Sequence, residues 1–462
     1  MYKKTIAILS VLIIFTDLTF GQTDNKREEV IPVKDLKSDL KYLKNKLENL
    51  HPNLYLYSPK TRIDFVFDSL ENSMTAPLTE LEFYRHVTII SSVIKDGHTI
   101  ILPGEKITDY HKRNSKFLPY HFAVINGRLF VDQVCTKDSS IKEGTEIISI
   151  NKQSSAEILN MLMERQVRDG NNLTYPSWIL NNYFREYYSF IFGHPEKYEI
   201  TYNTNGQAAT STINALLKDS IYFYRQQRYP GRSFVKEAND GIRLSIEKER
   251  NYAVLTIRSF ENSILKKEYK QNFERTVSDF FEQISNSKTE NLVLDLRNNQ
   301  GGDIENGVFL LSYLLDKPFT VVQDYVCIEN SELVHCNGPS LGVHKPKQDN
   351  FKGKLFVLIN GGSFSNSGIV ASCLQANNRA VFIGDETGGS DHALAGFIKT
   401  LSLPNSNIRI ELPTRQFLIT DKTPNTGHGI FPTHVIKPLL ADILEGKDTE
   451  MNYTIGLINK QQ

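Results

Sequence analysis

Three closely spaced serines are the first residues in this chain that could do chemistry. The segment 358–368 reads LINGGSFSNSG, an apolar run followed by two glycines and then by alternating serines. This order is typical of a strand that turns into a helix. At such a turn, free backbone N–H groups and the helix N-terminus favour negative charge, which suits an alkoxide or a tetrahedral oxyanion. Serine is also a preferred helix N-cap, so the pattern alone leaves both roles open.

Two other turns carry residue types that a serine nucleophile requires. The segment 295–302 reads DLRNNQGG, and the N–H groups of its two glycines could face a substrate carbonyl oxygen. The segment 96–99 reads DGHT, and the imidazole of His98, with an ordinary pKa of about 6.5, suits a general base near neutral pH. Taken alone, the glycines also fit a tight turn, and the histidine also fits a surface or helix-capping position.

The residues before the histidine turn indicate helices. A stripe of leucines spaced three and four residues apart predicts one amphipathic helix, formed by Leu36, Leu40, Leu43, Leu47 and Leu50. A second helix is expected at about 61–75. Thr79 and Glu82 are placed as the capping box of a third, which should end near Lys95. His98 is therefore expected directly after a helix.

Residues 117–170 change to strand patterns. Two apolar runs flank Asn126-Gly127, a strong hairpin signal. The stretch 140–151 contains GTEIISIN and resembles part of the PDZ domain, whose strand edge would capture an extended peptide. A small β-rich module without a ligand is the alternative. The next residues, 171–240, are rich in aromatics, which could pack in a core or line an apolar groove.

Residues 241–440 alternate between apolar, strand-like runs and helical segments. Strands are expected at 252–257, 291–296, 355–359 and 380–383, and helices at about 265–286, 304–315 and 366–377. This alternation indicates an α/β core with parallel strands. One more helix, at 439–445, should precede a polar end.

Composition excludes several classes of protein. Among 462 residues, Lys+Arg and Asp+Glu both number 53, so the net charge is zero and nothing supports nucleic-acid binding. Hydrophobic residues make up 40%, enough for sizeable cores. Four cysteines are too few for a disulfide scaffold, although Cys327 and Cys336 could form one hairpin disulfide. No cysteine or histidine cluster has metal-ligand spacing, and no cofactor is implied.

The N-terminus has the pattern of a secretory signal peptide over residues 1–21. Lys3 and Lys4 precede an apolar run at 5–15, and small and polar residues follow up to Gln22. That run is shorter than the roughly 20 residues that a membrane span needs. We expect a periplasmic or secreted protein with no stable membrane insertion after cleavage; an uncleaved anchor is the alternative.

Together, the three turns form an ordered signature. DLRNNQGG and the serine turn are followed, about twenty residues later, by IGDETGG at 383–389. This combination resembles the C-terminal processing (tail-specific) serine peptidase family, whose relatives include the tricorn core and the interphotoreceptor retinoid-binding protein. The resemblance implies a crotonase/ClpP-like α/β peptidase core with a helical N-terminal domain and a PDZ-like β-rich domain. The expected parts are a signal peptide at 1–21, a helical domain at 28–112, a PDZ-like domain at 115–170, an aromatic-rich linker at 171–240, the core at 241–445 and a tail at 446–462.

The resemblance also implies a role for each turn. Ser365 matches the family's nucleophile, and the oxyanion hole would consist of the N–H of Gly301 or Gly302 and that of Asn366. Relatives with a Ser–Lys dyad carry lysine 25 residues after the serine, where this chain has Ser390. The base is therefore expected to be a histidine, as in the tricorn-like branch.

That branch places a histidine in the N-terminal part, and His98 occupies the comparable position. Its orienting glutamate lies just before a Gly-Val-x-Pro stretch, but here Thr426 stands there. Glu386 is then the first candidate for this acid, followed by Asp391 and Asp421.

The resemblance implies an exported serine endopeptidase acting on peptides or unfolded proteins, and it gives no indication of oligomeric state. The missing lysine and the unassigned acid leave open a catalytically inactive protein that binds peptides or hydrophobic ligands on the same fold. A carbohydrate-active enzyme with Asp295 and Asp303 as its carboxylate pair has less support, because Asp295 beside Arg297 suits a structural salt bridge.

Overall fold

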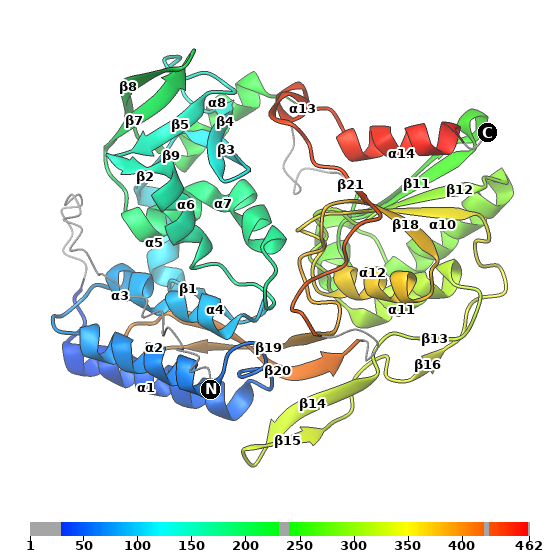
Figure 1. Ribbon diagram of the computed structural model, residues 1–462, viewed down its shortest axis with the longest axis horizontal. Helices are drawn as coiled ribbons and strands as arrows, with labels where there is room; N and C mark the ends of the chain where they lie inside the picture. Colours follow the sequence, from blue (N-terminus) through cyan, green and yellow to red (C-terminus); the bar gives the residue numbers. More distant parts are fainter. Residues whose placement is uncertain (1–28, 231–239, 420–424, 461–462) are drawn as a thin grey trace, which may run out of the picture.

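The computed structural model describes residues 29–230, 240–419 and 425–460. They form two lobes that a long β hairpin connects (Figure 1). One lobe holds the N-terminal helices and the β-rich module, and the other holds a mostly parallel sheet with its helices. The expected mixed α/β class is confirmed, whereas the expected signal peptide at 1–21 lies outside the described residues.

The N-terminal helices largely follow the predicted boundaries. They are α1 (Val33–Leu50), α2 (Lys60–Ser73), α3 (Glu80–Val87) and α4 (Ile89–Ile94). The leucine stripe of α1 is buried up to Leu47, and Thr79 and Glu82 form the predicted capping box. The third predicted helix is divided at Thr88 into α3 and α4. Lys95, with a φ of 60°, ends α4 and directs the chain into the histidine turn.

The β-rich module is larger than expected. Its main sheet contains, in spatial order, β3 (Tyr120–Ile125), β4 (Arg128–Val134), β5 (Glu146–Ile150), β7 (Lys197–Thr204) and β8 (Gln207–Asn214). The Asn126-Gly127 hairpin is confirmed, with a positive φ at both residues, as a type I′ turn requires. The module does not end at residue 170, because β7 pairs with β5 and covers an edge that would otherwise be open.

The segment expected to be an aromatic-rich linker is also structured. It contains α7 (Thr174–Phe192), the hairpin β7–β8 and α8 (Lys218–Arg228). The side chains of Leu180, Phe184 and Tyr188 on α7 lie in the same hydrophobic core as the N-terminal helices. The expected boundary near residue 112 therefore does not separate two cores.

A long hairpin connects this shared core to the second lobe. It consists of β19 (Ala393–Ser402) and β20 (Arg409–Leu418), and Leu403 and Ile410 contribute to the first lobe's core. Strand β1 (Ile100–Leu102), which begins two residues after His98, pairs with β20. The chain segment that carries the histidine is thus fixed to a hairpin that extends from the other lobe.

The second lobe contains the predicted parallel sheet. Its strands are, in spatial order, β10 (Ile242–Glu247), β11 (Tyr252–Ile257), β12 (Asn291–Asp295), β17 (Lys354–Ile359), β18 (Ala380–Gly384) and β21 (His434–Val435). All neighbours from β11 to β21 are parallel, and β10 is antiparallel at the edge. Three helices share one core with this sheet: α10 (Phe273–Ser287), α11 (Ile304–Leu314) and α12 (Asn366–Ala376).

The other face of the sheet is covered by the C-terminal region (Figure 1). After α13 (Leu440–Glu445), the expected polar tail forms α14 (Thr449–Asn459). Ile458 on α14 is buried against Phe356 and Leu358, whose side chains alternate with those that face α10 to α12. The tail is helical and packed, not an extended polar end, because a central parallel sheet needs cover on both faces.

Cys327 and Cys336 lie on a hairpin, as expected, formed by β14 (Asp324–Glu329) and β15 (Glu332–His335). The register pairs Cys327 with Val334, so the two cysteines are not directly opposite each other. Both thiols are free in this structure.

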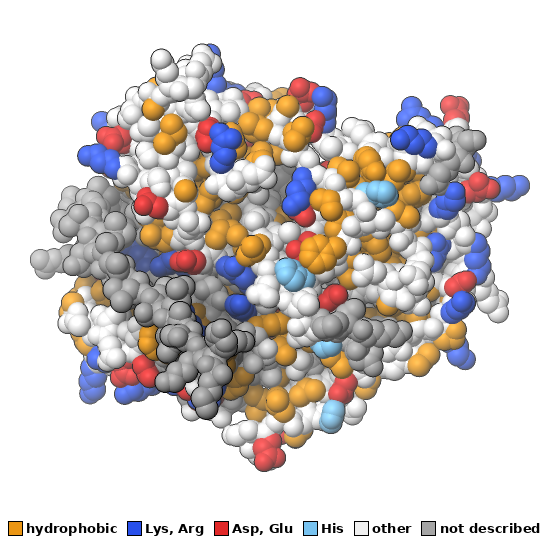
Figure 2. All heavy atoms as spheres, viewed as in Figure 1, with side chains coloured by type: hydrophobic (Ala, Val, Ile, Leu, Met, Phe, Trp, Pro, Cys, Tyr) orange, Lys and Arg blue, Asp and Glu red, His pale blue; other side chains and the backbone are white. Residues whose placement is uncertain are grey.

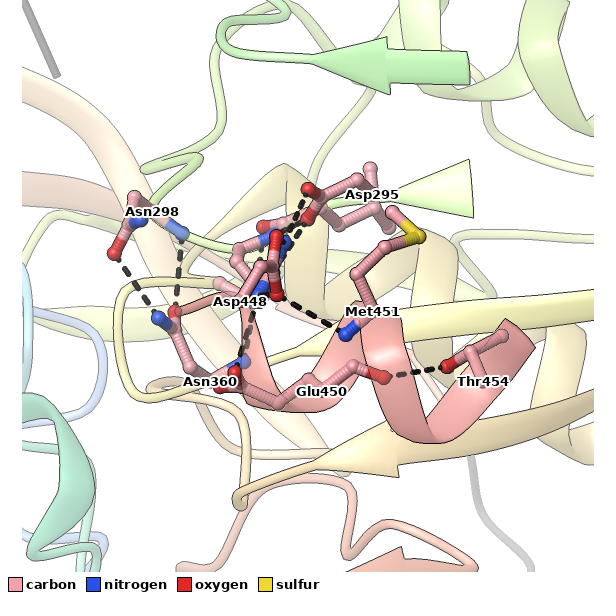
Figure 3. A network of polar contacts seen from close by, with 10 residues as sticks. Asp295, Asn298, Asn360, Asp448, Glu450, Met451 and Thr454 are labelled. Carbon is pink, nitrogen blue, oxygen red and sulfur yellow. Dashed lines mark hydrogen bonds and ion pairs between the residues drawn. The ribbon is translucent and has the colours of Figure 1, made fainter. Parts of the chain in front are cut away.

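An ion-pair network fixes α14 to the end of β12 (Figure 3). The guanidinium of Arg297 donates to Asp295 at 2.8 and 2.9 Å, to Asp448 at 2.7 and 2.8 Å and to Glu450 at 3.2 Å. The expected bridge between Asp295 and Arg297 is therefore confirmed. Because the side chains of Arg297 and Asp295 are each 13% exposed and that of Glu450 is 9% exposed, removal of the guanidinium would leave two poorly solvated carboxylates without their cation.

Arg297→Met should therefore lower the free energy of unfolding by about 3–5 kcal/mol, the range for breaking one side of a buried ion pair. Urea unfolding measures this loss. Arg275→Met is the matched control, because Arg275 is 84% exposed and faces Asp279 at 4.0 Å; it should cost at most about 0.5 kcal/mol. Equal losses for both variants would show that the network does not hold α14 in place.

Candidate active site

The serine turn and the glycine turn follow neighbouring parallel strands. The serine turn comes after β17 and the glycine turn after β12, so both lie at the carboxyl edge of the sheet, where open α/β sheets bind ligands. The Phe364 N–H donates to the Asn299 carbonyl at 3.0 Å, and the Ser363 hydroxyl donates to the Leu296 carbonyl at 2.8 Å. These bonds hold the two predicted turns together.

Ser365 has an unusual backbone conformation. Its φ of 55° and ψ of −123° are rarely adopted by a residue with a side chain, and such strain is typical of functional positions. It occupies the N-cap position of α12, yet its side chain makes no capping hydrogen bond. The N-cap alternative therefore fails for Ser365. A sharp strand-to-helix turn of this kind leaves the hydroxyl exposed for attack.

The two flanking serines differ from Ser365. Ser363 is buried, and its hydroxyl both donates to Leu296 and accepts from the Asn360 N–H at 3.1 Å. Ser367 is also buried, and its hydroxyl has no partner among the described residues. Of the three, Ser365 is the one whose hydroxyl reaches a basic group.

That group is His98. Its Nε2 lies 3.1 Å from the Ser365 Oγ, although the two residues are 267 positions apart in the chain. The distance is within the reach of a general base. The imidazole also stacks on the Phe364 ring, with a centroid separation of 4.6 Å. The structure thus brings together two residues that the sequence pattern singled out separately.

Burial lowers the pKa of His98 below its ordinary value, and the charge of Asp96 only partly opposes this effect. The ring is therefore neutral at neutral pH. A general base must accept the Ser365 proton at Nε2, and in that tautomer the ring proton resides on Nδ1. Nδ1 is buried and has no hydrogen-bond partner among the described residues.

Buried hydrogen bonds hold the histidine turn. Asp96 Oδ1 accepts from the His98 N–H at 2.9 Å and from the Thr99 hydroxyl at 3.0 Å. The Asn53 N–H donates to His51 Nδ1 at 3.0 Å, so His51 carries its proton on Nε2 and donates to the Thr99 oxygen at 2.7 Å. Sequence reasoning missed the supporting roles of His51 and Thr99, since no spacing pattern connects the loop after α1 to this turn.

The two glycines differ in what their N–H groups can do. The Gly301 N–H already donates to the Asn299 side chain at 2.8 Å. The N–H groups of Gly302 and Asn366 have no acceptor among the described residues. Gly301 instead permits close packing, because a Cβ there would lie 2.7 Å from the Asn366 nitrogen. Of the two glycines expected for the oxyanion hole, Gly302 therefore has the available donor.

Glu386 does not contact the histidine it was expected to orient. Its Oε1 lies 3.0 Å from His428 Nδ1 and accepts from the Asn172 side chain and the Gly429 N–H, both at 2.9 Å. The described part of the chain places no carboxylate on His98 Nδ1. Of the other candidate acids, Asp421 lies outside the described residues.

A groove of about 700 Å³ runs along the glycine turn, between the two lobes. Gly301 and Gly302 form part of its wall. Its aromatic lining includes Trp178 and Tyr183 from α7, so the aromatic segment contributes to a groove as well as to the core. Trp178 Nε1 also donates to the Asn298 side chain at 2.7 Å, which fixes α7 to the glycine turn. Charges of both signs are interspersed over the face shown in Figure 2.

Comparison with known proteins finds a family match for the part of the chain that carries Ser365 and the glycine turn. Residues 251–436 match the model of peptidase family S41. The chain is 29% identical over 192 residues to a carboxy-terminal-processing protease of Bartonella bacilliformis, which covers 39% of this chain and 38% of the relative. It is also 29% identical over 163 residues to the tail-specific protease of Haemophilus influenzae, which covers 34% of this chain and 20% of the relative. The matches thus span well under half of these relatives.

Among solved structures, the fold is similar to that of mature CPAF complexed with lactacystin. The TM-score is 0.68 at 15% identity, with 93% of this chain and 98% of that chain covered. A mutant of the same protein gives a TM-score of 0.66 at 15% identity, with 93% and 97% covered. At this identity, the likeness concerns the fold across both lobes, whereas the sequence match concerns the second lobe. Over residues 251–436, the second lobe is therefore similar to peptidase family S41.

Proposed function

We propose that this protein is an exported serine endopeptidase that hydrolyses peptide bonds in peptides or unfolded proteins. The observation that carries the proposal is the 3.1 Å contact between Ser365 Oγ and His98 Nε2, made at a strained turn of an S41 domain. The named relatives of this domain are proteases. No helix among the described residues has the length and apolar character needed to cross a membrane.

The mechanism is acyl transfer. Ser365 attacks the scissile carbonyl while His98 takes its proton, and the resulting oxyanion accepts hydrogen bonds from the N–H groups of Gly302 and Asn366. His98 then gives the proton to the leaving amine. Water hydrolyses the acyl-enzyme in the second half of the reaction, with His98 again as the base.

The substrate is held by the groove beside the glycine turn. We assign the β-rich module as PDZ-like and the second lobe as a crotonase/ClpP-like core, following the resemblance.

Edge strand β3 of the β-rich module is already partly occupied. The side chain of Asn181 accepts from the Val124 N–H at 2.8 Å, and that of Arg185 donates to the Tyr120 carbonyl at 2.8 Å. A peptide could add along the whole of edge strand β3 only by displacing both side chains. The aromatic groove therefore supplies most of the contact, and apolar side chains are favoured.

An inactive binding protein on the same fold is the less favoured alternative. It rests on the missing lysine and on the absence of a described carboxylate at His98 Nδ1. A strained serine aligned with a neutral imidazole, next to two unused N–H donors, is unnecessary for binding alone. This arrangement favours the enzyme.

Ser365→Ala should abolish the hydrolysis of an unfolded protein and labelling by a serine-directed acylating probe. Loss of the nucleophile should lower kcat by roughly 10⁴- to 10⁶-fold. Ser367→Ala is the matched control, because it removes a nearby buried hydroxyl that has no partner among the described residues. It should retain activity and labelling. A wild-type protein that is neither labelled nor active would exclude the peptidase, as would unchanged activity in Ser365→Ala.

The pH dependence of kcat/KM should show the ionisation of His98. Because burial lowers the pKa of His98 and the base form is required, kcat/KM should rise with pH through an ionisation below about 6.5. A pH series with a fluorogenic peptide measures this limb. His98→Ala should lose the limb together with most of the activity. A wild-type profile without an ionisation below that value would contradict the role of His98.

A further inference from the structure

Asp169, a residue outside every motif of the sequence, lies between the base and the nucleophile turn. It is 1% exposed and follows α6 (Ser155–Met163) in the first lobe. Its Oδ1 accepts from the Gly97 N–H at 2.7 Å, and its Oδ2 accepts from the Ser390 N–H at 3.0 Å. One buried carboxylate thus bonds to two backbone segments that are almost 300 residues apart in the chain.

Each of these segments belongs to the active site. Gly97 directly precedes His98. Ser390 lies in the loop after β18, and the Gly388 N–H of that loop donates to the Ser363 carbonyl at 3.0 Å. A continuous hydrogen-bonded path therefore runs from the nucleophile turn through Asp169 to the base.

The fit around Asp169 is close. The Gly170 N–H donates to the Lys95 carbonyl at 2.9 Å, so the histidine turn is held on both sides of Asp96 by the same segment. A Cβ at Gly97 would lie 2.8 Å from the Phe364 ring and 3.1 Å from Asp169 Oδ1. Because Gly97 is tightly packed between Phe364 and Asp169, we expect a displacement of Asp169 to move His98 as well.

We propose that Asp169 is a positioning residue that sets the distance between His98 and Ser365 by clamping the Gly97 and Ser390 N–H groups together. This inference rests on the proposed function. It explains how the imidazole is oriented without a described carboxylate on Nδ1: Asp96 holds the backbone of His98, and Asp169 holds the turn against the second lobe. Asp169 acts through the backbone and does not touch the reacting atoms.

These two hydrogen bonds from Gly97 and Ser390 to Asp169, here called the clamp, also depend on ionisation. A carboxylate is a better acceptor for two N–H groups than a carboxylic acid. Burial, with a smaller contribution from the charge of Asp96, raises the pKa of Asp169 to about 7, and the two N–H bonds oppose this shift. Besides Asp96, the titratable groups near Asp169 and the histidine turn include Tyr57, Tyr175, His51 and His98. The clamp is complete above neutral pH and weakens as the pH falls.

Asp169→Asn in the full chain tests the proposal, because asparagine keeps the shape but cannot accept both bonds equally well. A misplacement of about 1 Å can cost roughly 100-fold, so kcat should fall about 10- to 100-fold with KM little changed. The variant should also lose an ionisation near pH 7 while keeping the lower one that His98 contributes.

Asp39→Asn is the matched control. Asp39 is also a buried carboxylate that accepts two backbone N–H groups, from Asn405 at 3.1 Å and Ser406 at 2.8 Å, but it lies on α1 and bonds to neither the histidine turn nor the loop after β18. Thermal unfolding is measured for both variants. Asp39→Asn should lose stability and keep kcat. Equal kcat losses in both variants, or wild-type kcat in Asp169→Asn, would overturn the proposal.

A second readout separates this proposal from the peptidase itself. In the Ser365→Ala background, the ¹⁵N imidazole signals of His98, assigned with His98→Gln, should shift with Asp169→Asn and stay unchanged with Asp39→Asn. If the wild-type protein shows neither hydrolysis nor labelling, but Asp169→Asn still shifts the His98 signals, the peptidase is refuted and the positioning role of Asp169 stands. Absence of the shift would refute the clamp whatever the activity.

Discussion

The structure depends on holding a neutral imidazole 3.1 Å from a strained serine when the two residues belong to different lobes. The serine needs only its own strand, turn and helix to be presented. The histidine must be held in position by other segments, because its turn lies at the end of a short helix in the first lobe. Strand β1, paired with a hairpin from the second lobe, and the buried carboxylates Asp96 and Asp169 hold it there.

Sequence reasoning worked best where the constraint is local. The leucine stripe of α1, the capping box at Thr79 and the Asn126-Gly127 hairpin are set by residues within a few positions of one another, and all three were predicted. The strand and helix alternation of the second lobe was recognised for the same reason. Local patterns made Ser365 and His98 candidates only, because a helix N-cap and a surface histidine fit the same patterns; the family resemblance of the three turns together assigned their roles.

Prediction failed where long-range pairing decides the outcome. The sequence predicts a linker in the aromatic-rich segment, since nothing in its pattern shows that β7 pairs with β5. The polar tail becomes α14 because the sheet needs a second cover and Arg297 offers a cation to Asp448. At the site, Glu386 is the first predicted orienting acid, but its carboxylate accepts hydrogen bonds from Asn172 and Gly429. Asp169 has no motif, and only the fold reveals its two N–H partners.

The proposed mechanism has one decisive intermediate, an acyl group carried by Ser365 after the amine product has left. Acid-quenching the enzyme during turnover of a peptide of known mass, followed by digestion and mass spectrometry, would trap it. We predict that the mass of the substrate's acyl half is added to the fragment containing Ser365 and that this adduct disappears when the substrate is exhausted. Turnover without any adduct, or with the adduct on another residue, would contradict nucleophilic catalysis by Ser365.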